Sequence, residues 1–311
     1  MKLVLALGGN ALLKRGQAPD PELQRANIAM AATSLAPVIR RHASVLTHGN
    51  GPQVGMLALQ ALADPARPPF PLDVLGAESE GMIGYVLEQE LFNRLPGHEI
   101  ATLLTQVEVD PGDPAFSRPD KPIGPVYLQA EAEGLAQSRG WTVARDGDYW
   151  RRVVASPRPR RILALPAIRR LADAGVTVIC AGGGGIPVAR GDDGALFGLE
   201  AVIDKDAASA LLALELGVDA LVMLTDVAAV MTDFGTPAQR ALRRATPDAL
   251  EGLAFAAGSM GPKVTAAVAM ARAGRRAAIG AIGELEAILA GEAGTWIEPA
   301  HAADEPGLAW W

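Results

Sequence analysis

Three glycine-rich turns, each directly after a short apolar run, constrain the fold of this 311-residue chain more than any other feature. The turns are Gly8-Gly9-Asn10, Gly49-Asn50-Gly51 and the four glycines at 182–185. Short apolar runs that alternate with helix-compatible segments are typical of α/β proteins with parallel sheets. Because the carboxyl ends of parallel strands open on one edge of the sheet, we expect the three turns to meet in one crevice.

The rest of the chain fits this alternation except in one region. Periodicity predicts helices at 22–41, 53–62, 73–95, 166–174, 204–216 and 263–273, and strands at 2–7, 44–48, 99–109, 176–180, 220–224 and 276–282. Between 110 and 161 the chain is rich in proline and includes Trp141, Tyr149 and Trp150. That composition predicts an irregular insertion, or small lid, that is long enough to hang over a site.

Composition excludes several classes of protein. Lys and Arg number 28 against 35 Asp and Glu, and the net charge of −7 argues against a protein that coats nucleic acid or an anionic membrane. No apolar stretch approaches the roughly 20 residues that span a bilayer. Cys180 is the single cysteine, so no intramolecular disulfide can form. We therefore expect a soluble protein in a reducing, cytoplasmic setting.

Glycine turns that lead into helices are suited to a phosphate-rich ligand. Backbone amides approach an anion freely where there is no Cβ atom, and the helix amino end adds a positive dipole. Plain tight turns are the alternative interpretation. The fingerprints G-x-x-x-x-G-K-[ST] and G-x-G-x-x-G are both absent, as are the protein-kinase motifs. The absence of these motifs argues against a P-loop enzyme and against an ordinary dinucleotide-binding dehydrogenase.

Lysine is rare in this chain, since 23 of the 28 basic residues are arginine. Where a surface cation is sufficient the chain uses arginine, so a lysine indicates a place that needs a compact ammonium group. The five are Lys2, Lys14, Lys121, Lys205 and Lys263. A solvated loop cation is the competing interpretation at each position.

Two of these lysines are expected at helix starts. Lys205 stands between Asp204 and Asp206, where Asp204 is a candidate N-cap and Asp206 a candidate partner for an ammonium group. Lys263 follows a glycine-containing turn, and Lys121 lies in the insertion. Ammonium groups that converge from several loops would stabilise a transferring phosphoryl group electrostatically, without a covalent nucleophile.

Other polar residues carry weaker signals. Asp226 ends a predicted strand and is either a contact for a nucleotide or a metal's water shell, or a plain polar loop residue. The four histidines show no metal-ligand spacing, and His48 is expected to hydrogen-bond at a strand end. We expect Cys180 to be a small buried hydrophobe, and Trp310-Trp311 to pack on the protein's own surface or on a partner.

At these residues, the chain resembles the carbamate kinases of the amino acid kinase superfamily, and the resemblance covers nearly its whole length. The segments that carry the resemblance are ALGGNA (6–11), THGNGPQVG (47–55), LTQV (104–107), VDP (109–111), KPIGP (121–125), GGGGIPV (182–188), EAVIDKD (200–206) and GSMGPK (258–263). The first glycine turn and the TDV segment at 225–227 are shared across the superfamily. The segments HGNGPQVG, KPIGP and GGGGIPV are together much more specific.

The resemblance implies a three-layer αβα sandwich with a mostly parallel central sheet. It implies an N-terminal lobe, 1–190, for carbamoyl phosphate or carbamate, with a small protruding lid subdomain at 111–160. A C-terminal lobe, 191–311, would bind the nucleotide. The implied protein is a homodimer that catalyses the reversible reaction of ADP and carbamoyl phosphate to ATP and carbamate. Mg²⁺ would accompany ATP or ADP, held mainly through the phosphates and not by a protein metal site.

The resemblance also assigns roles to individual residues. Lys121, Lys205, Lys263 and Asp206 would be catalytic, with Asp206 orienting the two lysines nearest it. The residues implied to surround carbamoyl phosphate are Gly8, Gly9, Asn10, Gly49, Asn50, Gly51, Gly183 and Gly184. Those implied to lie at the nucleotide are Lys205, Asp226, Met260 and Lys263.

Two positions depart from the family's pattern, and two other functions stay open. Glu80 stands where similar sequences commonly carry Gln, and Met231 replaces a more usual Tyr. One alternative is another kinase of the superfamily, resembling acetylglutamate kinase. The other is a catalytically silent sensor of nucleotide or carbamoyl phosphate, although the presence of both Lys205 and Lys263 counts against it.

Overall fold

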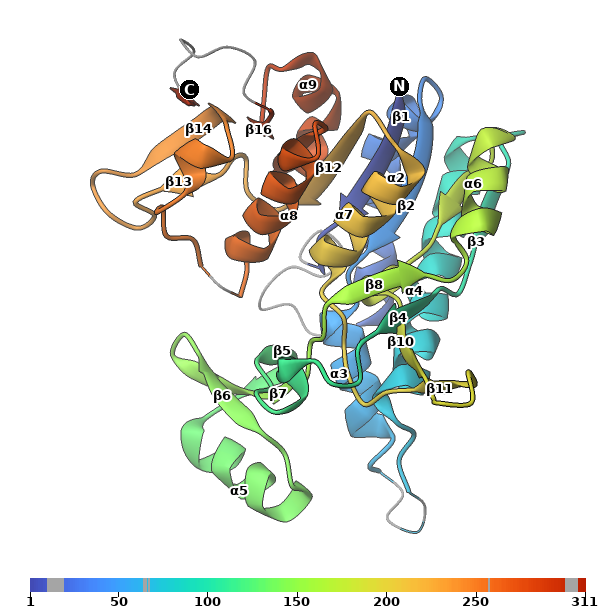
Figure 1. The fold of residues 1–311 in the computed structure, drawn as a ribbon, viewed down its shortest axis with the longest axis vertical. Coiled ribbons are helices and arrows are strands. Elements are labelled where there is room, and N and C mark those ends of the chain that lie inside the picture. The colour runs from blue at the N-terminus through green and yellow to red at the C-terminus, as the bar shows by residue number, and fades with distance from the viewer. Residues whose placement is uncertain (10–19, 64–65, 67, 257, 300–306) are drawn as a thin grey trace.

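A large, mostly parallel sheet forms the centre of the computed structural model, which describes residues 1–9, 20–63, 66, 68–256, 258–299 and 307–311 (Figure 1). β1 (Lys2–Leu7) lies in its middle, parallel to β2 (Ala43–His48) on one side and β12 (Ala220–Thr225) on the other. The strand order is β13 (Met231–Thr232), β14 (Arg240–Ala245), β16 (Thr295–Ile297), β15 (Arg276–Ala281), β12, β1, β2, β9 (Thr177–Ile179) and β3 (Ile100–Thr102), and β17 (Leu308–Trp310) pairs with β14.

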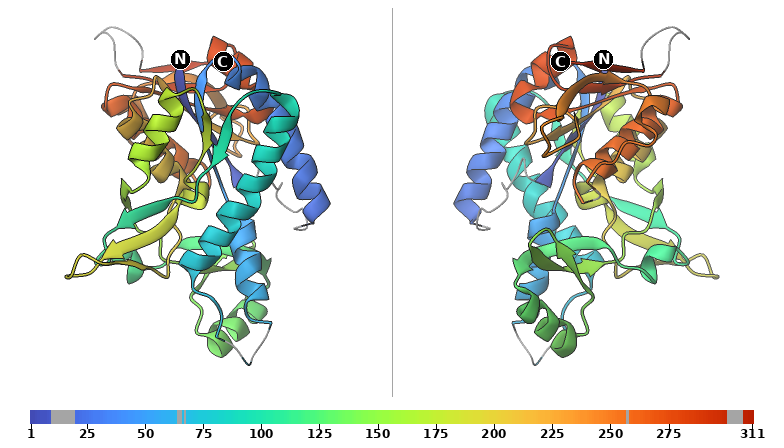
Figure 2. Two further views of the ribbon diagram at one scale, coloured as in Figure 1. Left: turned by 90° about the vertical axis from the view of Figure 1, so that its right-hand side faces the viewer. Right: turned by 90° about the vertical axis from the view of Figure 1, so that its left-hand side faces the viewer.

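Helices cover both faces of this sheet (Figure 2). On one face lie α2 (Pro21–Ile39), α4 (Leu72–Arg94) and α9 (Leu285–Ala290), and on the other α6 (Leu165–Asp173), α7 (Lys205–Leu216) and α8 (Met260–Arg272). The alternation of side chains along β1 explains the two layers. Leu3, Leu5 and Leu7 pack in the core under α2, α4 and α9, whereas Val4 and Ala6 belong to the core under α6, α7 and α8. The predicted three-layer αβα sandwich is confirmed.

The short helices of the described chain lie at its turns. α3 (Gly51–Gln60) follows β2 and contacts α4. The 3₁₀ turns are η1 (Pro114–Phe116), η2 (Gly182–Gly184), η3 (Asp248–Leu250) and η4 (Ile282–Glu284). α2 begins where Asp20 accepts a hydrogen bond from the backbone N–H of Leu23 at 2.9 Å, with Pro21 as the first helical residue.

The segment predicted as a single strand at 99–109 is two strands in different sheets. β3 ends at Thr102 and β4 (Gln106–Val109) joins a second sheet of order β11 (Leu196–Gly198), β10 (Ile186–Arg190), β4 and β8 (Pro159–Ile162). Between the two strands the Thr105 hydroxyl donates to the Leu103 carbonyl at 2.8 Å. Such a local side-chain bond competes with the regular ladder.

The insertion is more regular than its composition predicts. It holds a three-stranded sheet of order β5 (Lys121–Tyr127), β7 (Tyr149–Val154) and β6 (Val143–Asp146), with α5 (Gln129–Arg139) beside it. Figure 1 shows this lid projecting below the central sheet. The guanidinium groups of Arg139 and Arg152 lie 5.1 and 4.8 Å from the ring of Trp141, so the aromatic residue packs within the lid.

The central sheet is continuous across the predicted lobe boundary at 190. β1, β2, β9 and β3 precede that position, while β12 and the strands beyond it follow, and β1 pairs directly with β12. The C-terminal tryptophans lie on the protein's own sheet, where the guanidinium of Arg240 stacks 4.0 Å from the ring of Trp310. In the described part of the chain, no helix is both long and apolar enough to cross a membrane.

Candidate active site

The first two glycine turns touch each other at the carboxyl ends of β1 and β2. The backbone N–H of Gly8 donates to the Leu224 carbonyl at 2.7 Å, and that of Gly49 donates to Leu7 at 2.9 Å. A Cβ atom on Gly49 would lie 2.9 Å from the Gly9 nitrogen, so only glycine allows this approach. Strands β1, β2 and β9 are neighbours in the sheet, which explains why the turns that follow them meet.

The third turn closes over the second. A Cβ atom on Gly183 would lie 2.1 Å from Nδ2 of Asn50, and one on Gly184 would lie 2.6 Å from the carbonyl oxygen of Ile203. Both glycines have positive φ angles, +65° and +98°, which L side chains rarely adopt. The predicted convergence of the three turns is therefore confirmed, and the third turn reaches the residue that precedes Asp204.

For two of the residues predicted to surround carbamoyl phosphate, Gly51 and Asn10, we describe no contact with the other glycine turns. Gly51 begins α3, and a Cβ atom there would meet nothing within 4 Å. Asn10 lies outside the described residues.

Two of the three predicted catalytic lysines meet at one carboxylate. Lys205 Nζ lies 2.5 Å from Oδ1 of Asp206, and Lys263 Nζ lies 3.1 Å from its Oδ2. Asp206 is buried and the two lysine side chains are largely buried, with exposed fractions of 11%, 13% and 5% for Lys205, Lys263 and Asp206. Two buried ammonium groups against one carboxylate leave a local excess of positive charge, which suits an anion of high charge.

Burial and mutual charge set the protonation of this cluster. Burial alone would raise the pKa of Asp206, but the ammonium groups of Lys205 and Lys263 outweigh it and hold that pKa at about 2. Burial lowers the pKa of Lys205, and the neighbouring charge of Lys263 lowers it further, while Asp206 opposes both effects. Asp206 is therefore the group that keeps a buried lysine charged.

Two helix amino ends place the lysines. Lys205 is the first residue of α7, and its neighbour Asp204 caps that helix by accepting hydrogen bonds from the backbone N–H groups of Asp206 and Ala207 at 2.9 and 3.0 Å. Lys263 lies in the first turn of α8, which packs beside α7 (Figure 1). The positive ends of both helix dipoles thus lie at the lysine pair.

Lys121, from the lid, also lies at the start of α7, but it pairs with Asp204 and not with Asp206. Lys121 Nζ lies 2.5 Å from Oδ2 of Asp204, which is the other oxygen of the N-cap carboxylate. Burial would raise the pKa of Asp204, but the charge of Lys121 and the hydrogen bonds from Lys121 and the Ala207 N–H together outweigh burial and lower it. Lys121 is thus held beside the residue that precedes Lys205, in keeping with its predicted place at the site. The motifs did not indicate its partner, Asp204.

A close backbone crossing docks the lid. A Cβ atom on Gly55 of α3 would lie 2.0 Å from the Cα of Gly124 in β5, three residues from Lys121. Arg151 donates to the Gly124 carbonyl at 2.7 Å and fixes the same strand. The helix that begins at the second glycine turn thus also carries the strand that holds Lys121.

The candidate nucleotide residues lie at the ends of β12 and α8. Asp226 directly follows β12, where the Thr225 hydroxyl donates to its carboxylate at 3.0 Å. The first glycine turn approaches the same strand end, since a Cβ atom on Gly8 would lie 3.7 Å from the Thr225 Cα. Met260 begins α8, one turn before Lys263. The role of these residues at a nucleotide stays a prediction.

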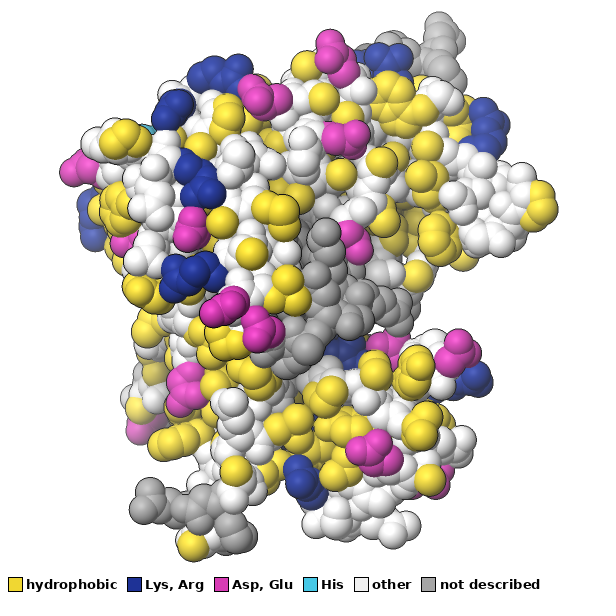
Figure 3. Space-filling model, turned by 180° about the vertical axis from the view of Figure 1, so that it is seen from behind, with side chains coloured by type: hydrophobic (Ala, Val, Ile, Leu, Met, Phe, Trp, Pro, Cys, Tyr) yellow, Lys and Arg dark blue, Asp and Glu magenta, His cyan; other side chains and the backbone are white. Residues whose placement is uncertain are grey.

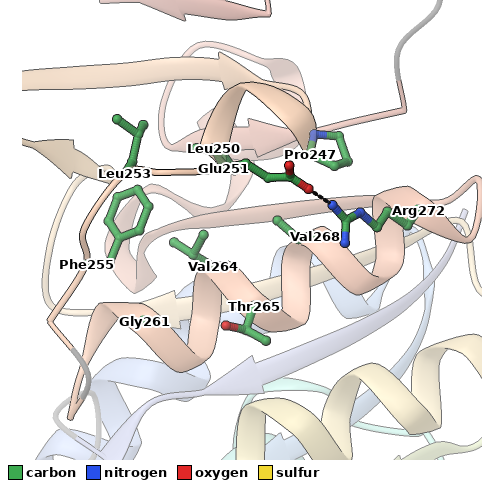
Figure 4. Close-up of a pocket in the computed structure, with 10 residues that line it drawn as sticks. All are labelled: Pro247, Leu250, Glu251, Leu253, Phe255, Gly261, Val264, Thr265, Val268 and Arg272. Atoms are coloured by element: carbon green, nitrogen blue, oxygen red, sulfur yellow. Dashed lines mark hydrogen bonds and ion pairs between the residues drawn. The ribbon is translucent and has the colours of Figure 1, made fainter.

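A separate pocket of about 350 Å³ lies along α8, between that helix and the segment 247–255 (Figure 4). Its walls are mainly apolar, and an ion pair between Glu251 and Arg272 closes one side. None of the predicted site residues lines it. The lysine cluster and this pocket are therefore different places in the molecule.

The site also contains Ser79, which the sequence did not indicate, and Glu80, which the sequence indicated only as a departure from the family's pattern. Ser79 and Glu80 of α4 are 0% and 1% exposed and face the glycine turns. The sequence signal for them is their place on the apolar face of α4, in register with Leu72, Leu75, Ile83 and Leu87, where a polar pair is unexpected. His48 is also buried, and burial lowers its pKa to about 4.

The carboxylates at the site are already engaged. Asp206 binds two lysines, and Asp204 binds Lys121 and the start of α7. Among the described residues there is no group of three or more His, Cys, Asp or Glu side chains that could hold a metal ion.

Comparison with known proteins identifies close relatives. The model of the amino acid kinase family matches residues 1–280. Carbamate kinases of Escherichia coli (strain K12) and Rhizobium meliloti (strain 1021) are 56% and 54% identical, over 95% and 96% of this chain and 98% and 93% of theirs. The structure of carbamate kinase from Giardia lamblia bound to citric acid aligns with a TM-score of 0.90 and 39% identity, over 96% of this chain and 98% of that one. The same enzyme bound to AMP-PNP aligns with a TM-score of 0.86.

Proposed function

The chain belongs to the amino acid kinase family, and we propose that it transfers a phosphoryl group between carbamoyl phosphate and ADP. The observation that carries this proposal is the pair of buried lysines on Asp206, beside three glycine turns that meet at one edge of the sheet. Relatives that share more than half of their residues with this chain, over nearly its whole length, are carbamate kinases.

The reaction needs charge more than covalent chemistry. The bond between phosphorus and the carbamate oxygen breaks, and a bond forms from phosphorus to a terminal oxygen of ADP, giving carbamate and ATP. No proton has to move in this step. Lys205 and Lys263 stabilise the charge on the transferring phosphoryl oxygens, and Asp206 keeps both ammonium groups in position. In reverse, the same groups serve transfer from ATP to carbamate.

The two substrates occupy different parts of the crevice in this proposal. The glycine turns supply backbone N–H donors to carbamoyl phosphate, in the lobe formed by 1–190. Asp226 and Met260 lie at the nucleotide in the lobe formed by 191–311. Lys121 enters from the lid and adds a third ammonium group close to the other two. Its bond to Asp204 supports this, because Asp204 is the residue directly before Lys205.

Mg²⁺ is proposed to arrive with the nucleotide. The engaged state of Asp204 and Asp206 supports a metal held mainly through phosphate oxygens, which is the usual way that Mg²⁺ binds in kinases. When bound, the ion neutralises phosphate charge and supports the same transfer that the lysines stabilise.

A homodimer and a cytoplasmic location are further proposals. Met30 on α2 and Tyr85 and Phe92 on α4 are 56%, 59% and 44% exposed, on helices that cover the face seen in Figure 3. Large exposed apolar side chains on neighbouring helices support an interface between two copies. A cytoplasmic location is supported by the one cysteine, Cys180, which is free and buried.

The test is a coupled assay of ATP formation from ADP, carbamoyl phosphate and Mg²⁺. Consumption of ATP with acetylglutamate, glutamate and aspartate is measured beside it. The proposal predicts ATP formation from carbamoyl phosphate and no activity on the amino acids. Activity only on an amino acid would instead identify another kinase of the family. Nucleotide binding without any turnover would identify a silent sensor.

A further inference from the structure

One turn of helix α4 contacts both glycine turns that are proposed to hold carbamoyl phosphate. Ser79 and Glu80 are consecutive, fully buried residues on its inner face. Ser79 contacts the turn at 49–51 through Asn50, and Glu80 contacts the turn at 182–185 through Gly182. Neither side chain is used in the phosphoryl-transfer step, so their polar groups in an apolar face require another explanation.

Ser79 fixes the direction of the Asn50 amide. Nδ2 of Asn50 donates to Oγ of Ser79 at 2.7 Å, and the Ser79 hydroxyl donates in turn to the Gly76 carbonyl at 2.7 Å. Because that hydroxyl proton is committed to a carbonyl, Oγ can only accept from Asn50. The amide therefore cannot flip without loss of a buried hydrogen bond. Its face lies against Gly183, where a Cβ atom would come 2.1 Å from Nδ2.

Glu80 fixes the third turn in the same manner. Its Oε1 accepts a hydrogen bond from the backbone N–H of Gly182 at 2.7 Å, and its Oε2 accepts one from Thr105 at 3.0 Å. Thr105 is itself tied to this turn, since its hydroxyl oxygen accepts from the N–H of Ala181 at 2.9 Å and its carbonyl from Ile186 at 2.8 Å. One carboxyl group thus joins both ends of the glycine segment to α4.

The space around Gly182 shows how closely this arrangement is packed. A Cβ atom on Gly182 would lie 2.4 Å from the His48 ring and 2.8 Å from the Cγ of Glu80. His48 directly precedes Gly49, so Gly182 is held between the strand end that leads to the second turn and the helix residue that binds the third turn. A shift of the Glu80 side chain would therefore move both turns relative to each other.

We propose that Ser79 and Glu80 are positioning residues, which hold the Asn50 and Gly182 turns in the mutual arrangement that binds carbamoyl phosphate. Neither touches the reacting atoms. Their effect is on the precision of the backbone donors, and small misplacements of such groups reduce the rate strongly. This inference rests on the proposed function of the turns, and it concerns the carbamoyl phosphate half of the site and not the nucleotide half.

The test measures ATP formation with each substrate varied in turn, in Ser79→Ala, Glu80→Gln and Glu80→Ala. We expect kcat/KM for carbamoyl phosphate to fall about tenfold or more in Ser79→Ala and Glu80→Ala, with KM for ADP within about twofold of wild type. Glu80→Gln keeps one acceptor oxygen, so it should lie between wild type and Glu80→Ala. If Glu80→Ala fails to fold, the near-isosteric Gln variant and Ser79→Ala carry the test.

Matched controls come from the same chain. Glu78→Gln removes an exposed carboxylate from the residue of α4 that directly precedes Ser79. Ser138→Ala removes an exposed helix hydroxyl, which donates a hydrogen bond to the Gly134 carbonyl at 2.8 Å. Both should behave as wild type. The inference is overturned if the Ser79 and Glu80 variants keep wild-type kcat/KM, or if KM for ADP rises in step with that for carbamoyl phosphate. A wild-type protein that is inactive on carbamoyl phosphate would instead overturn the proposed function.

Discussion

Lys205 and Lys263 share the carboxylate of Asp206, one ammonium group on each of its oxygens, although the two lysines lie on different helices. This relationship links the start of α7 to the start of α8 and concentrates positive charge at the edge of the sheet where the glycine turns meet. A protein with a net charge of −7 thus gains a local excess of positive charge at this site without a cationic surface.

Asp206→Asn should lower kcat by about tenfold or more, because the amide leaves two buried ammonium groups without a countercharge. Burial already lowers the pKa of Lys205, and removal of the carboxylate lowers it further. As the pH is raised, the variant should therefore lose activity at a lower pH than wild type does. The control is Asp219→Asn, at the other end of β12, where the carboxylate accepts a hydrogen bond from the Lys2 backbone N–H at 2.7 Å. If kcat of Asp206→Asn and kcat of wild type fell over the same alkaline pH range, this role of Asp206 would be contradicted.

Lys121→Ala should abolish most activity while the fold stays intact. Lys121 and Asp204 are 30% and 22% exposed, and Asp204 keeps the N–H groups of Asp206 and Ala207 as partners, so loss of this part-buried ion pair should cost about 1–3 kcal/mol of stability. The measurement is kcat beside the thermal transition. A transition that collapses together with activity would assign Lys121 a structural role instead.

Gly55→Ala should weaken catalysis by displacing the strand that carries Lys121, since the new methyl group would lie 2.0 Å from the Gly124 Cα. We expect a loss of about tenfold or more in kcat. The loss should be much smaller when the substitution is made in a Lys121→Ala background. Gly81→Ala in α4, where a Cβ atom meets nothing within 4 Å, is the control. Full additivity of Gly55→Ala and Lys121→Ala would show that the crossing does not act through the lysine.

Glu80 should make the stability of the protein depend on pH. Burial raises its pKa to about 8, partly opposed by hydrogen bonds from Thr105 and Gly182, from an ordinary value of 4.5. Between these pH values the folded protein keeps a proton that the unfolded chain has released, so the stability from this group is fully present below pH 4.5. It is lost as the pH rises through 8.

The comparison that checks this is the difference in Tm between wild type and Glu80→Gln at pH 5, 7 and 9. Wild type should lose about 4 °C or more relative to the Gln variant across that range. Glu78→Gln, which changes an exposed carboxylate, should track wild type at every pH. A constant difference between wild type and Glu80→Gln would contradict the raised pKa.

The strand ends and helix starts of this site are readable in the sequence because they depend on local chemistry. Glycine at 8, 49 and 182 marks the turns, and Asp204 marks the beginning of α7. The pairing of Lys263 with Asp206 is different, since the two residues are 57 positions apart and meet only because α8 packs on α7. No local pattern encodes that contact, and the family resemblance supplied it.

Strands with distant partners were the least predictable part of the fold. β4 pairs with β10 and β8, neither of which is its neighbour in sequence, and β14 pairs with the distant strands β16 and β17 as well as with its neighbour β13. Ser79 was not predicted, and the role of Glu80, noticed only as a departure from the family's pattern, was not predicted either, for a similar reason. Their contacts, Asn50 and Gly182, come from turns 29 and 102 residues away.

The central claim is that Lys205 and Lys263 stabilise the transferring phosphoryl group, and turnover in Lys205→Ala and Lys263→Ala with ADP, Mg²⁺ and carbamoyl phosphate tests it most directly. Each variant should lose about a hundredfold or more in kcat, the order of loss seen when a preorganised electrostatic donor is removed. Lys2→Ala is the control, because its ammonium group pairs with Asp173 at the surface, 2.8 Å away. Near-normal kcat in either lysine variant would remove that lysine from the mechanism and contradict the account.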